Sequence, residues 1–312
     1  MPKTVNEEFR TIYRPPYSAD ASACVNTLKK YYDARKDGEI VDVVTLTEQY
    51  NAIGSHAFDV CHVKELTIPD TVTRLGRFAF ADCKTLKKIT LGKGIEKCGE
   101  DLIFRSNVQE IVWTKPIGKD VDDALSSLLY GLIREEPTIF CNTDEIRLNR
   151  GRIFLQTGEA QKTFLLTYNS RSIRLPRCIN NYINMFVIQD MVHAAFASGT
   201  KEISRSLSYR LILGTMHDFQ NKVSVALELY ILEGLSDAER YLQNNAVKIA
   251  KTFAEVGDDI ALSKFVSLGL MDAEALLQTL PITQEKKLPT SVSYLLDEMR
   301  KCGLRMPDAL QV

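Results

Sequence analysis

The chain has 312 residues, of which 45% are hydrophobic and 25% are charged, and its formal net charge is −1. These values are typical of a folded globular protein with room for two domains, and they exclude a whole-chain field that attracts nucleic acid or an anionic membrane. Residues 1–16 hold charges and prolines but no apolar run, which argues against a secretory signal. No stretch reaches the ~20 apolar residues of a membrane-spanning helix. Seven cysteines without a Cys-x-x-Cys pair favour reduced thiols, so we expect a cytoplasmic protein without a membrane partner.

Residues 1–40 are expected to form an N-terminal cap that includes a helix, and a repeat begins after them. The pattern Gly-x-x-Ala-Phe-x-x-Cys occurs in Ile53–Cys61 and returns in Leu75–Cys83, an offset of 22 residues (75 − 53). A third, decayed copy begins at Cys98, after a further 23 residues (98 − 75). Short runs typical of strands alternate with the copies: Val44–Leu46, Leu66–Ile68, Ile89–Leu91 and Ile111–Trp113.

Such a repeat indicates a stack of coils, because no single copy can bury its apolar face, whereas stacked copies build a continuous core. Gly54, Gly76 and Gly99 recur at one repeat position, and we expect them to give the backbone the freedom to turn. The equivalent cysteines Cys61 and Cys83 are expected to stack as small buried thiols, with a disulfide or a metal site as the less favoured alternatives.

Residues Leu66–Leu86 resemble the BspA-like leucine-rich repeat, in which a strand and Ile-Pro precede Val-x-x-Ile-Gly-x-x-Ala-Phe-x-x-Cys-x-x-Leu. The resemblance is good at residues 44–65 and weaker in the third copy. It implies a parallel-strand solenoid with a protein-binding surface in a bacterial protein. The family's members are often secreted or surface proteins, and the missing export signal departs from that pattern.

In a parallel stack, alternate strand residues leave the core, and this places two rows on the outside. Thr45, Thr67, Thr90 and Val112 form one row, and Glu65, Lys88 and Glu110 form the other. These seven residues are the predicted protein-binding ridge, and the alternative is a solvated face. We expect residues 41–136 to form the solenoid together with a capping helix at 119–136.

Residues 137–181 are predicted to be a β-rich connector, with strands at 138–141, 152–156, 163–168 and 172–175. An arginine-rich set lies in this connector: Arg147, Arg150, Arg152, Arg171, Arg174 and Arg177. If the strands pair, these side chains could converge into a patch for phosphates or an acidic protein, although a solvated face is the favoured interpretation. This patch supports the alternative function, a protein associated with nucleic acid.

Residues 182–312 show helical periodicity to the end. A capping box at Ser236 predicts one helix to about Glu255. Gly257 and Gly269 are expected to end helices, and Asp258 or Asp259 to begin the next one. Asp272 can start another helix before Pro281. The segment 250–269 resembles an ankyrin-type helix pair, and 293–300 resembles the outer helix of a second pair. The whole region is similar to helical regions of some cytoplasmic leucine-rich-repeat proteins of gut anaerobes.

No catalytic constellation stands out, and we expect no enzyme activity, no cofactor and no metal. The glycines at 92–99 fit neither a dinucleotide fingerprint nor a phosphate loop. His56 and His62 could ligate a metal with Asp59, but a surface location is favoured. The predicted fold is therefore an α+β repeat protein: a short leucine-rich-repeat solenoid, a small β segment and an all-helical, ankyrin-like C-terminal domain. Its predicted function is to bind a protein, with an enzyme site between the two halves as a further alternative.

Overall fold

The computed structural model describes residues 10–13, 25–33, 35–36, 39–118, 123–135, 162–179, 183–197, 213–214, 216 and 218–304. The chain divides into two compact units. The first, here called the solenoid unit, comprises residues 1–136 and 159–215, and the second, the helical unit, comprises 137–158 and 216–312. The division differs from the sequence-based boundaries because residues 159–215 belong with the solenoid.

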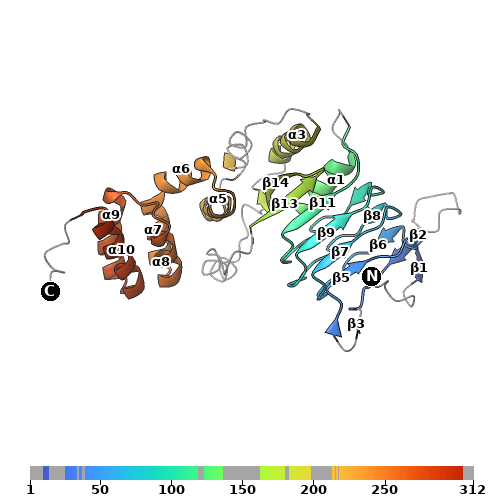
Figure 1. Cartoon of the computed structure of the whole chain (residues 1–312), viewed down its shortest axis with the longest axis horizontal. Coiled ribbons are helices and arrows are strands. Elements are labelled where there is room, and N and C mark those ends of the chain that lie inside the picture. Colours follow the sequence, from blue (N-terminus) through green and yellow to red (C-terminus); the bar gives the residue numbers. More distant parts are fainter. Residues whose placement is uncertain are drawn as a thin grey trace. The chain divides into compact units, whose positions relative to one another are not determined.

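The solenoid unit is built on a six-stranded sheet with the order β14-β13-β11-β9-β7-β5, which Figure 1 shows as a ladder of strands. Its strands are β5 (Val43–Thr45), β7 (Glu65–Thr67), β9 (Lys88–Leu91), β11 (Glu110–Trp113), β13 (Thr163–Tyr168) and β14 (Arg171–Pro176). Neighbouring strands are parallel from β5 to β13, and β14 returns antiparallel. The predicted solenoid is thereby confirmed, and β13 and β14 extend its sheet.

A second, five-stranded sheet with the order β1-β2-β6-β8-β10 forms another side of the coils. Its strands are β1 (Arg10–Tyr13), β2 (Val25–Leu28), β6 (Ala52–Ile53), β8 (Arg74–Leu75) and β10 (Lys97–Cys98). Two short pairs join β3 (Arg35–Lys36) to β4 (Glu39–Ile40) and β12 (Arg134–Glu135) to β15 (Cys178–Ile179). The helix expected in residues 1–40 is not among the described residues of that segment, which form β1 to β4.

Each coil runs from one long strand to the next, so residues 43–64, 65–87 and 88–109 are coils one, two and three. Their interior is apolar: Phe58 of coil one and Phe80 of coil two are buried, with ring centroids 5.5 Å apart. Tyr31 stacks on Phe58 from the other side at 4.7 Å. This aromatic column, rather than any one coil, is the core that the repeat predicted.

The recurring glycines are needed for close approach and not for turning. Gly76 does not have a positive φ, but a Cβ on it would lie 2.3 Å from the backbone nitrogen of Ser55 in coil one. A Cβ on Gly99 would lie 2.4 Å from the nitrogen of Arg77. Side chains at these positions would hold neighbouring coils apart. We expected glycine here because it frees the backbone to turn, and that reason was wrong.

The tight turns of the coils use other residues in the left-handed region. His56 and Phe78 share one repeat position and have φ values of 57° and 56°, and Val60 and Asp82 share another with 63° and 53°. The rings of His56 and Phe78 stack at 5.0 Å, and the nitrogen of Val60 donates to the carbonyl of Ala81 at 3.2 Å. Contacts between coils therefore hold a backbone conformation that is costly for residues with a Cβ.

Val60→Asn is expected to stabilise the solenoid unit by about 1 kcal/mol, because valine is unfavourable at positive φ and asparagine tolerates it. The side chain of Val60 is 59% exposed, so little buried apolar area is lost. Urea unfolding followed by the fluorescence of Trp113, the single tryptophan of the chain, measures this change in the solenoid unit. Val43→Asn in strand β5 is the control and should not stabilise; an equal gain there would contradict the explanation.

Helices close the C-terminal end of the coil stack. Helix α1 (Asp123–Leu132) buries Leu125 and Leu128, and its Gly131 carbonyl accepts a hydrogen bond from the Leu102 nitrogen of coil three at 2.8 Å. The nitrogen of Cys98 donates to the Ser127 hydroxyl at 2.9 Å. The predicted capping helix is thus present. Helix α3 (Ile183–Ala197) lies beside α1 and β14.

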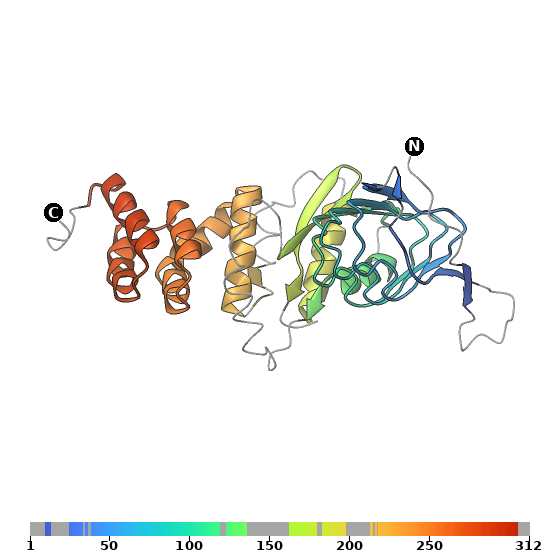
Figure 2. The same cartoon turned by 90° about the horizontal axis from the view of Figure 1, so that it is seen from below.

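The helical unit is a series of short helices. They are α5 (Phe219–Glu233), α6 (Ser236–Asn244), α7 (Ala246–Glu255), α8 (Asp259–Ser267), α9 (Ala273–Glu285) and α10 (Pro289–Lys301). Helix α7 packs on α9 and α8 packs on α10, so the pair α7–α8 stacks on the pair α9–α10. Figure 2 shows the two pairs, coloured orange and red, next to each other. The helices predicted for this region are present, arranged as stacked pairs.

Most predicted helix ends are found, and two are not. Asp258 and Asp272 accept from the nitrogens of Ala261 and Ala275 as N-caps, and Gly257 and Gly269 have positive φ values at helix ends. Ser236, however, is a helical residue without the predicted cap, and the helix expected to run to Glu255 breaks at Asn245. Helix α9 begins after Asp272, as expected, and runs through Pro281.

Helix α10 is capped from another helix. Its own N-cap residue, Leu288, has no capping side chain, and the Asp259 carboxylate of α8 accepts from the nitrogens of Thr290 at 3.0 Å and Ser291 at 2.7 Å. Burial acts to raise the pKa of Asp259, but the hydrogen bonds from Ser291 and Thr290 outweigh it and hold the pKa below its ordinary value. The ionised carboxylate therefore couples the two helix pairs.

We expect Asp259→Ala to destabilise the helical unit by about 1–2 kcal/mol, the usual cost of removing a cap. Because the pKa of Asp259 is lower in the folded state than in the unfolded chain, its contribution is complete above the unfolded value and is lost as the pH falls through the folded value. Urea unfolding followed by circular dichroism, as a function of pH, measures both effects. Asp259→Asn should weaken the acid sensitivity; an unchanged acid profile in this variant would contradict the assignment.

Candidate functional site

The outward side of the six-stranded sheet carries two continuous rows of side chains, here together called the strand face. The first row, in strand register, is Thr45, Thr67, Thr90, Val112, Thr167 and Ser172. The second is Val43, Glu65, Lys88, Glu110, Leu165 and Arg174. All twelve are exposed or half-buried, while the residues between them along each strand are buried. The register thus aligns the seven ridge residues as the alternation predicted, and adds five more.

Polar contacts cross the centre of the strand face. Lys88 and Glu110 form an ion pair with 3.0 Å between Nζ and Oε2. The Thr167 hydroxyl donates to Glu110 Oε1 at 2.9 Å and lies 3.0 Å from the Ser172 hydroxyl. In the described part of the chain, no hydrogen bond or ion pair engages the carboxylate of Glu65, whose backbone nitrogen donates to the carbonyl of Asp42 at 3.0 Å. At the centre of the strand face, the polar side chains therefore pair with one another. On strand β7, the carboxylate of Glu65 remains available.

The predicted arginine patch is only partly visible. Arg147, Arg150 and Arg152 lie outside the described residues. The other three are on or beside β14, where alternation places Arg174 on the strand face and Arg171 on the opposite side of the sheet. The guanidinium of Arg171 donates to the carbonyl of Ala195 at 3.5 Å. Arg171 and Arg174 therefore lie on opposite sides of the sheet.

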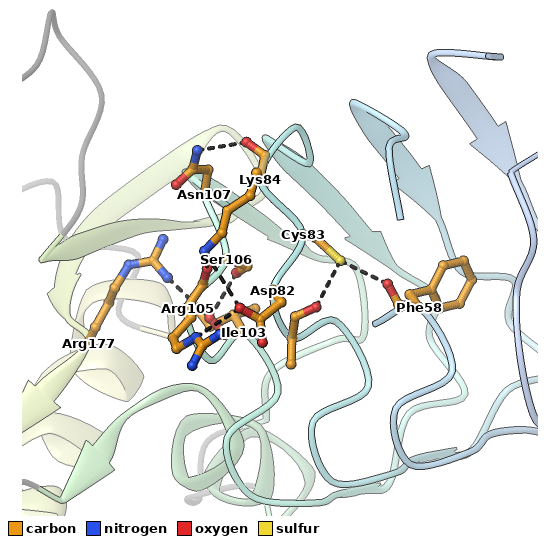
Figure 3. A network of polar contacts seen from close by, with 10 residues as sticks. Phe58, Asp82, Cys83, Lys84, Ile103, Arg105, Ser106, Asn107 and Arg177 are labelled. Carbon is orange, nitrogen blue, oxygen red and sulfur yellow. Dashed lines mark hydrogen bonds and ion pairs between the residues drawn. The ribbon is translucent and has the colours of Figure 1, made fainter. Parts of the chain in front are cut away.

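Arg177 makes hydrogen bonds that stabilise the fold, and Figure 3 shows it beside a network of polar contacts. Its guanidinium donates to the carbonyls of Ile103, at 3.4 Å, and Val108 of coil three, and to that of Thr163 at 3.3 Å. Backbone carbonyls are acceptors that otherwise require water or a donor. Arg177 thus joins coil three to β13, a role that leaves it poorly placed for phosphate.

The same network ties the turns of coils two and three together (Figure 3). Asp82 pairs with Arg105 at 2.8 Å, Lys84 donates to the carbonyl of Arg105, and Asn107 donates to the carbonyl of Lys84 at 2.6 Å. The Asp82–Arg105 and Lys84–Asn107 bonds join equivalent positions of neighbouring coils, 23 residues apart. The network is accounted for by coil stacking.

Comparison with family models matches residues 39–126 to the BspA type leucine rich repeat region, in six copies. This segment is a BspA-type leucine-rich repeat. The matched residues contain all the coil-forming strands from β5 to β11 and the first turn of the capping helix α1. Comparison with curated proteins and with solved structures gave no match.

The histidines of the BspA-type repeat pair with nearby acids. His62 Nδ1 lies 2.7 Å from an Asp33 oxygen, and His56 Nδ1 lies 3.5 Å from Asp59. Within the described ranges, no three of the metal-binding side chains His, Cys, Asp and Glu come together. The two histidines therefore have separate partners at the coil surface, and the alternative of a shared metal site with Asp59 gains no support from their positions.

The cysteines of the BspA-type repeat are poor candidates for a nucleophile. Burial raises the pKa of Cys98 to about 12. The hydrogen bond with Cys83, then burial, raises the pKa of Cys61 far above its ordinary value. Since the thiolate is the reactive form, neither thiol is an activated catalytic nucleophile near neutral pH. A search of the described helices also finds none that is long and apolar enough to cross a membrane.

Of the five strand-face residues outside the predicted ridge, four come from outside the recognised repeat. Leu165 and Thr167 are in β13, which pairs in parallel with β11 and continues both rows. Val43 lies one residue before the predicted first strand. The signal for β13 was its alternation of apolar and polar residues, the same one that identified the other strands.

Proposed function

We propose that this protein is a non-enzymatic scaffold that binds a protein partner through the strand face of its BspA-type repeat. The observation that carries the proposal is the alignment of two rows of exposed and half-buried side chains across six strands. A repeat solenoid commonly uses such a surface for binding. The proposal includes a bacterial, cytoplasmic protein, as the resemblance and the composition suggest.

Rigidity supports this function. The side chains between the rows, such as Leu66, Ile89 and Ile111, are at most 1% exposed and hold the strands from beneath. The Lys88–Glu110 pair fixes two long side chains in the middle of the face. A surface that is ordered before binding loses less conformational entropy when it binds, so a broad polar face can still bind a protein.

The chemistry of the face suggests what the partner supplies. Threonine hydroxyls both donate and accept hydrogen bonds, and Val43 and Leu165 add apolar area at two separate places. Glu65 provides an acidic group that a donor from the partner can pair with. This mixture suits a protein surface. It suits a phosphate backbone less, because binding to one depends on several cations acting together.

The helical unit would present a second surface. The stacked pairs α7–α8 and α9–α10 leave Ile260, Leu277 and Tyr294 exposed. Large exposed apolar side chains are enriched where proteins meet, and stacked helix pairs display them on a repeating framework. We assign this unit a supporting part in binding and place the principal contact on the strand face.

The double variant Thr67→Arg with Thr90→Arg should lose partner capture from a host lysate while it folds normally. Both side chains are half-buried on the strand face, so two arginines cover the face without entering the core. The readout is mass spectrometry of proteins retained after nuclease treatment. Ser55→Arg, an exposed position on another side of coil one, is the control and should capture normally. Undiminished capture by the folded double variant would exclude the strand face, and capture abolished by nuclease would move the function to nucleic acid.

A further inference from the structure

Two equivalent cysteines meet inside the coil stack. Cys61 of coil one and Cys83 of coil two are separated by 22 residues in sequence, and their sulfur atoms lie 3.3 Å apart. Both thiols are free and buried, with exposed fractions of 5% and 0%. Two sulfur atoms at this distance are in contact but not bonded, since a disulfide bond is about 2.0 Å long.

The backbone around the pair is already held in register. The nitrogens of Phe58 and Val60 in coil one donate to the carbonyls of Ala79 and Ala81 in coil two, at 2.8 and 3.2 Å. The Cys83 thiol donates to the Phe58 carbonyl at 3.0 Å, the contact drawn in Figure 3. Because these bonds fix the two turns beside each other, the sulfur atoms have to approach by only about 1.3 Å to reach bonding distance.

We propose that Cys61 and Cys83 are a disulfide site, at which an oxidised low-molecular-weight disulfide such as oxidised glutathione links coil one to coil two. The thiolate of one cysteine attacks a glutathione sulfur and releases one reduced glutathione. The thiolate of the other cysteine then attacks the protein–glutathione sulfur, forms the Cys61–Cys83 bond and releases the second. Two thiols of the protein are oxidised and one glutathione disulfide is reduced, so that atoms and electrons balance.

Location makes this pair different from the other described cysteines. Cys98 does not share its repeat position, and Cys302 is an exposed residue of the helical unit. Only a pair held together in the folded state gains the high effective concentration that favours an internal bond over a glutathione adduct. Since both thiols are buried, the exchange requires a transient opening of the turns. The exchange is therefore slow, and the structure favours the disulfide once equilibrium is reached.

The expected consequence is a stiffer repeat. A bond across a 22-residue separation restricts the unfolded chain, and it links two coils that carry strands β5 and β7 of the strand face. Oxidation gives up the thiol hydrogen bond to Phe58, which is a smaller effect than the loop constraint. We therefore expect oxidation to stabilise the solenoid unit.

The test uses the full chain with Cys302→Ser, which removes the exposed thiol that could link two molecules. The protein is equilibrated with oxidised glutathione and its remaining thiols are alkylated. It is then digested without reduction for peptide mapping by mass spectrometry. The expected product is a linked peptide pair that contains Cys61 and Cys83. The Trp113-detected melting temperature should rise by several degrees, and dithiothreitol should reverse the rise.

Cys61→Ala in the same background is the matched control, because it keeps a small buried side chain but cannot form the bond. It should show neither the linked peptides nor the rise in melting temperature. Free thiols, glutathione adducts or bonds to other cysteines at equilibrium would overturn the proposal. A Cys61–Cys83 bond that lowers the melting temperature would also overturn it, because the folded coils would then not accommodate the bond.

Discussion

Phe80→Ala is expected to destabilise the solenoid unit by about 3–5 kcal/mol, the usual cost of removing a buried phenylalanine. Phe80 is 1% exposed, and its ring lies 5.5 Å from that of Phe58 in the neighbouring coil. Its backbone nitrogen donates a hydrogen bond to the carbonyl of Leu102 in coil three at 2.9 Å. The coils on both sides therefore restrict how far the cavity left by the substitution can collapse. Urea unfolding detected by Trp113 fluorescence measures the loss.

The control for this variant is Phe186→Ala on helix α3. Phe186 is 61% exposed, so the same truncation there leaves no cavity and should change the unfolding free energy by no more than about 0.5 kcal/mol. Similar effects for the two variants would mean that Phe80 does not lie inside the coil, and the register of the repeat would then be wrong.

The second large effect is expected for Gly94→Ala, which should cost about 3 kcal/mol or more by forcing neighbouring coils apart. A Cβ at residue 94 would lie 1.9 Å from the carbonyl oxygen of Asp70 and 2.9 Å from that of Val72. Both atoms belong to the backbone of coil two, so no side-chain rotation relieves the overlap. The unfolding free energy of the solenoid unit, again from Trp113 fluorescence, is the measurement.

Gly118→Ala is the matched control, because nothing lies within 4 Å of a Cβ built at that position. It should leave stability nearly unchanged. If Gly94→Ala were as well tolerated as Gly118→Ala, the close approach of coils two and three would be incorrect, and the glycines of the repeat would need another explanation.

The sequence predicted the solenoid because its signal is repeated. The Gly-x-x-Ala-Phe-x-x-Cys pattern fixes both the coil length and the equivalence of positions, so the pairing of Glu65 with Lys88 and of Lys88 with Glu110 followed directly. The second sheet was missed because each of its coil strands, such as β8, has only two residues. A strand that short has no measurable alternation.

Helix ends show the same dependence on local signals. Asp258, Asp272 and Gly269 act through bonds or backbone conformations within a few residues, and sequence inspection found them. The cap that Asp259 supplies to α10 spans 32 residues and depends on how the helix pairs stack. Contacts of that kind arise from tertiary packing and leave no pattern in the neighbouring sequence.

The candidate site was predictable in its rows but not in its extent. Alternation placed Thr67 and Thr90 outside, whereas the addition of β13 and β14 depends on which strand pairs with β11. The arginine hypothesis treated Arg171 and Arg174 as members of one patch, but alternation along one strand sends them to opposite sides of the sheet. The residues that share a surface are decided by which strands pair and by which side of the sheet each side chain faces, and not by composition.

The central claim is that the strand face contacts a protein, and site-specific photo-crosslinking tests it most directly. A photoreactive amino acid replaces Thr67 on the strand face or, as the control, exposed Ser55 on another side of coil one. After irradiation in host lysate and nuclease treatment, the account predicts a discrete protein adduct from position 67 and none from position 55. An adduct only from position 55, or one that nuclease removes, would contradict the account.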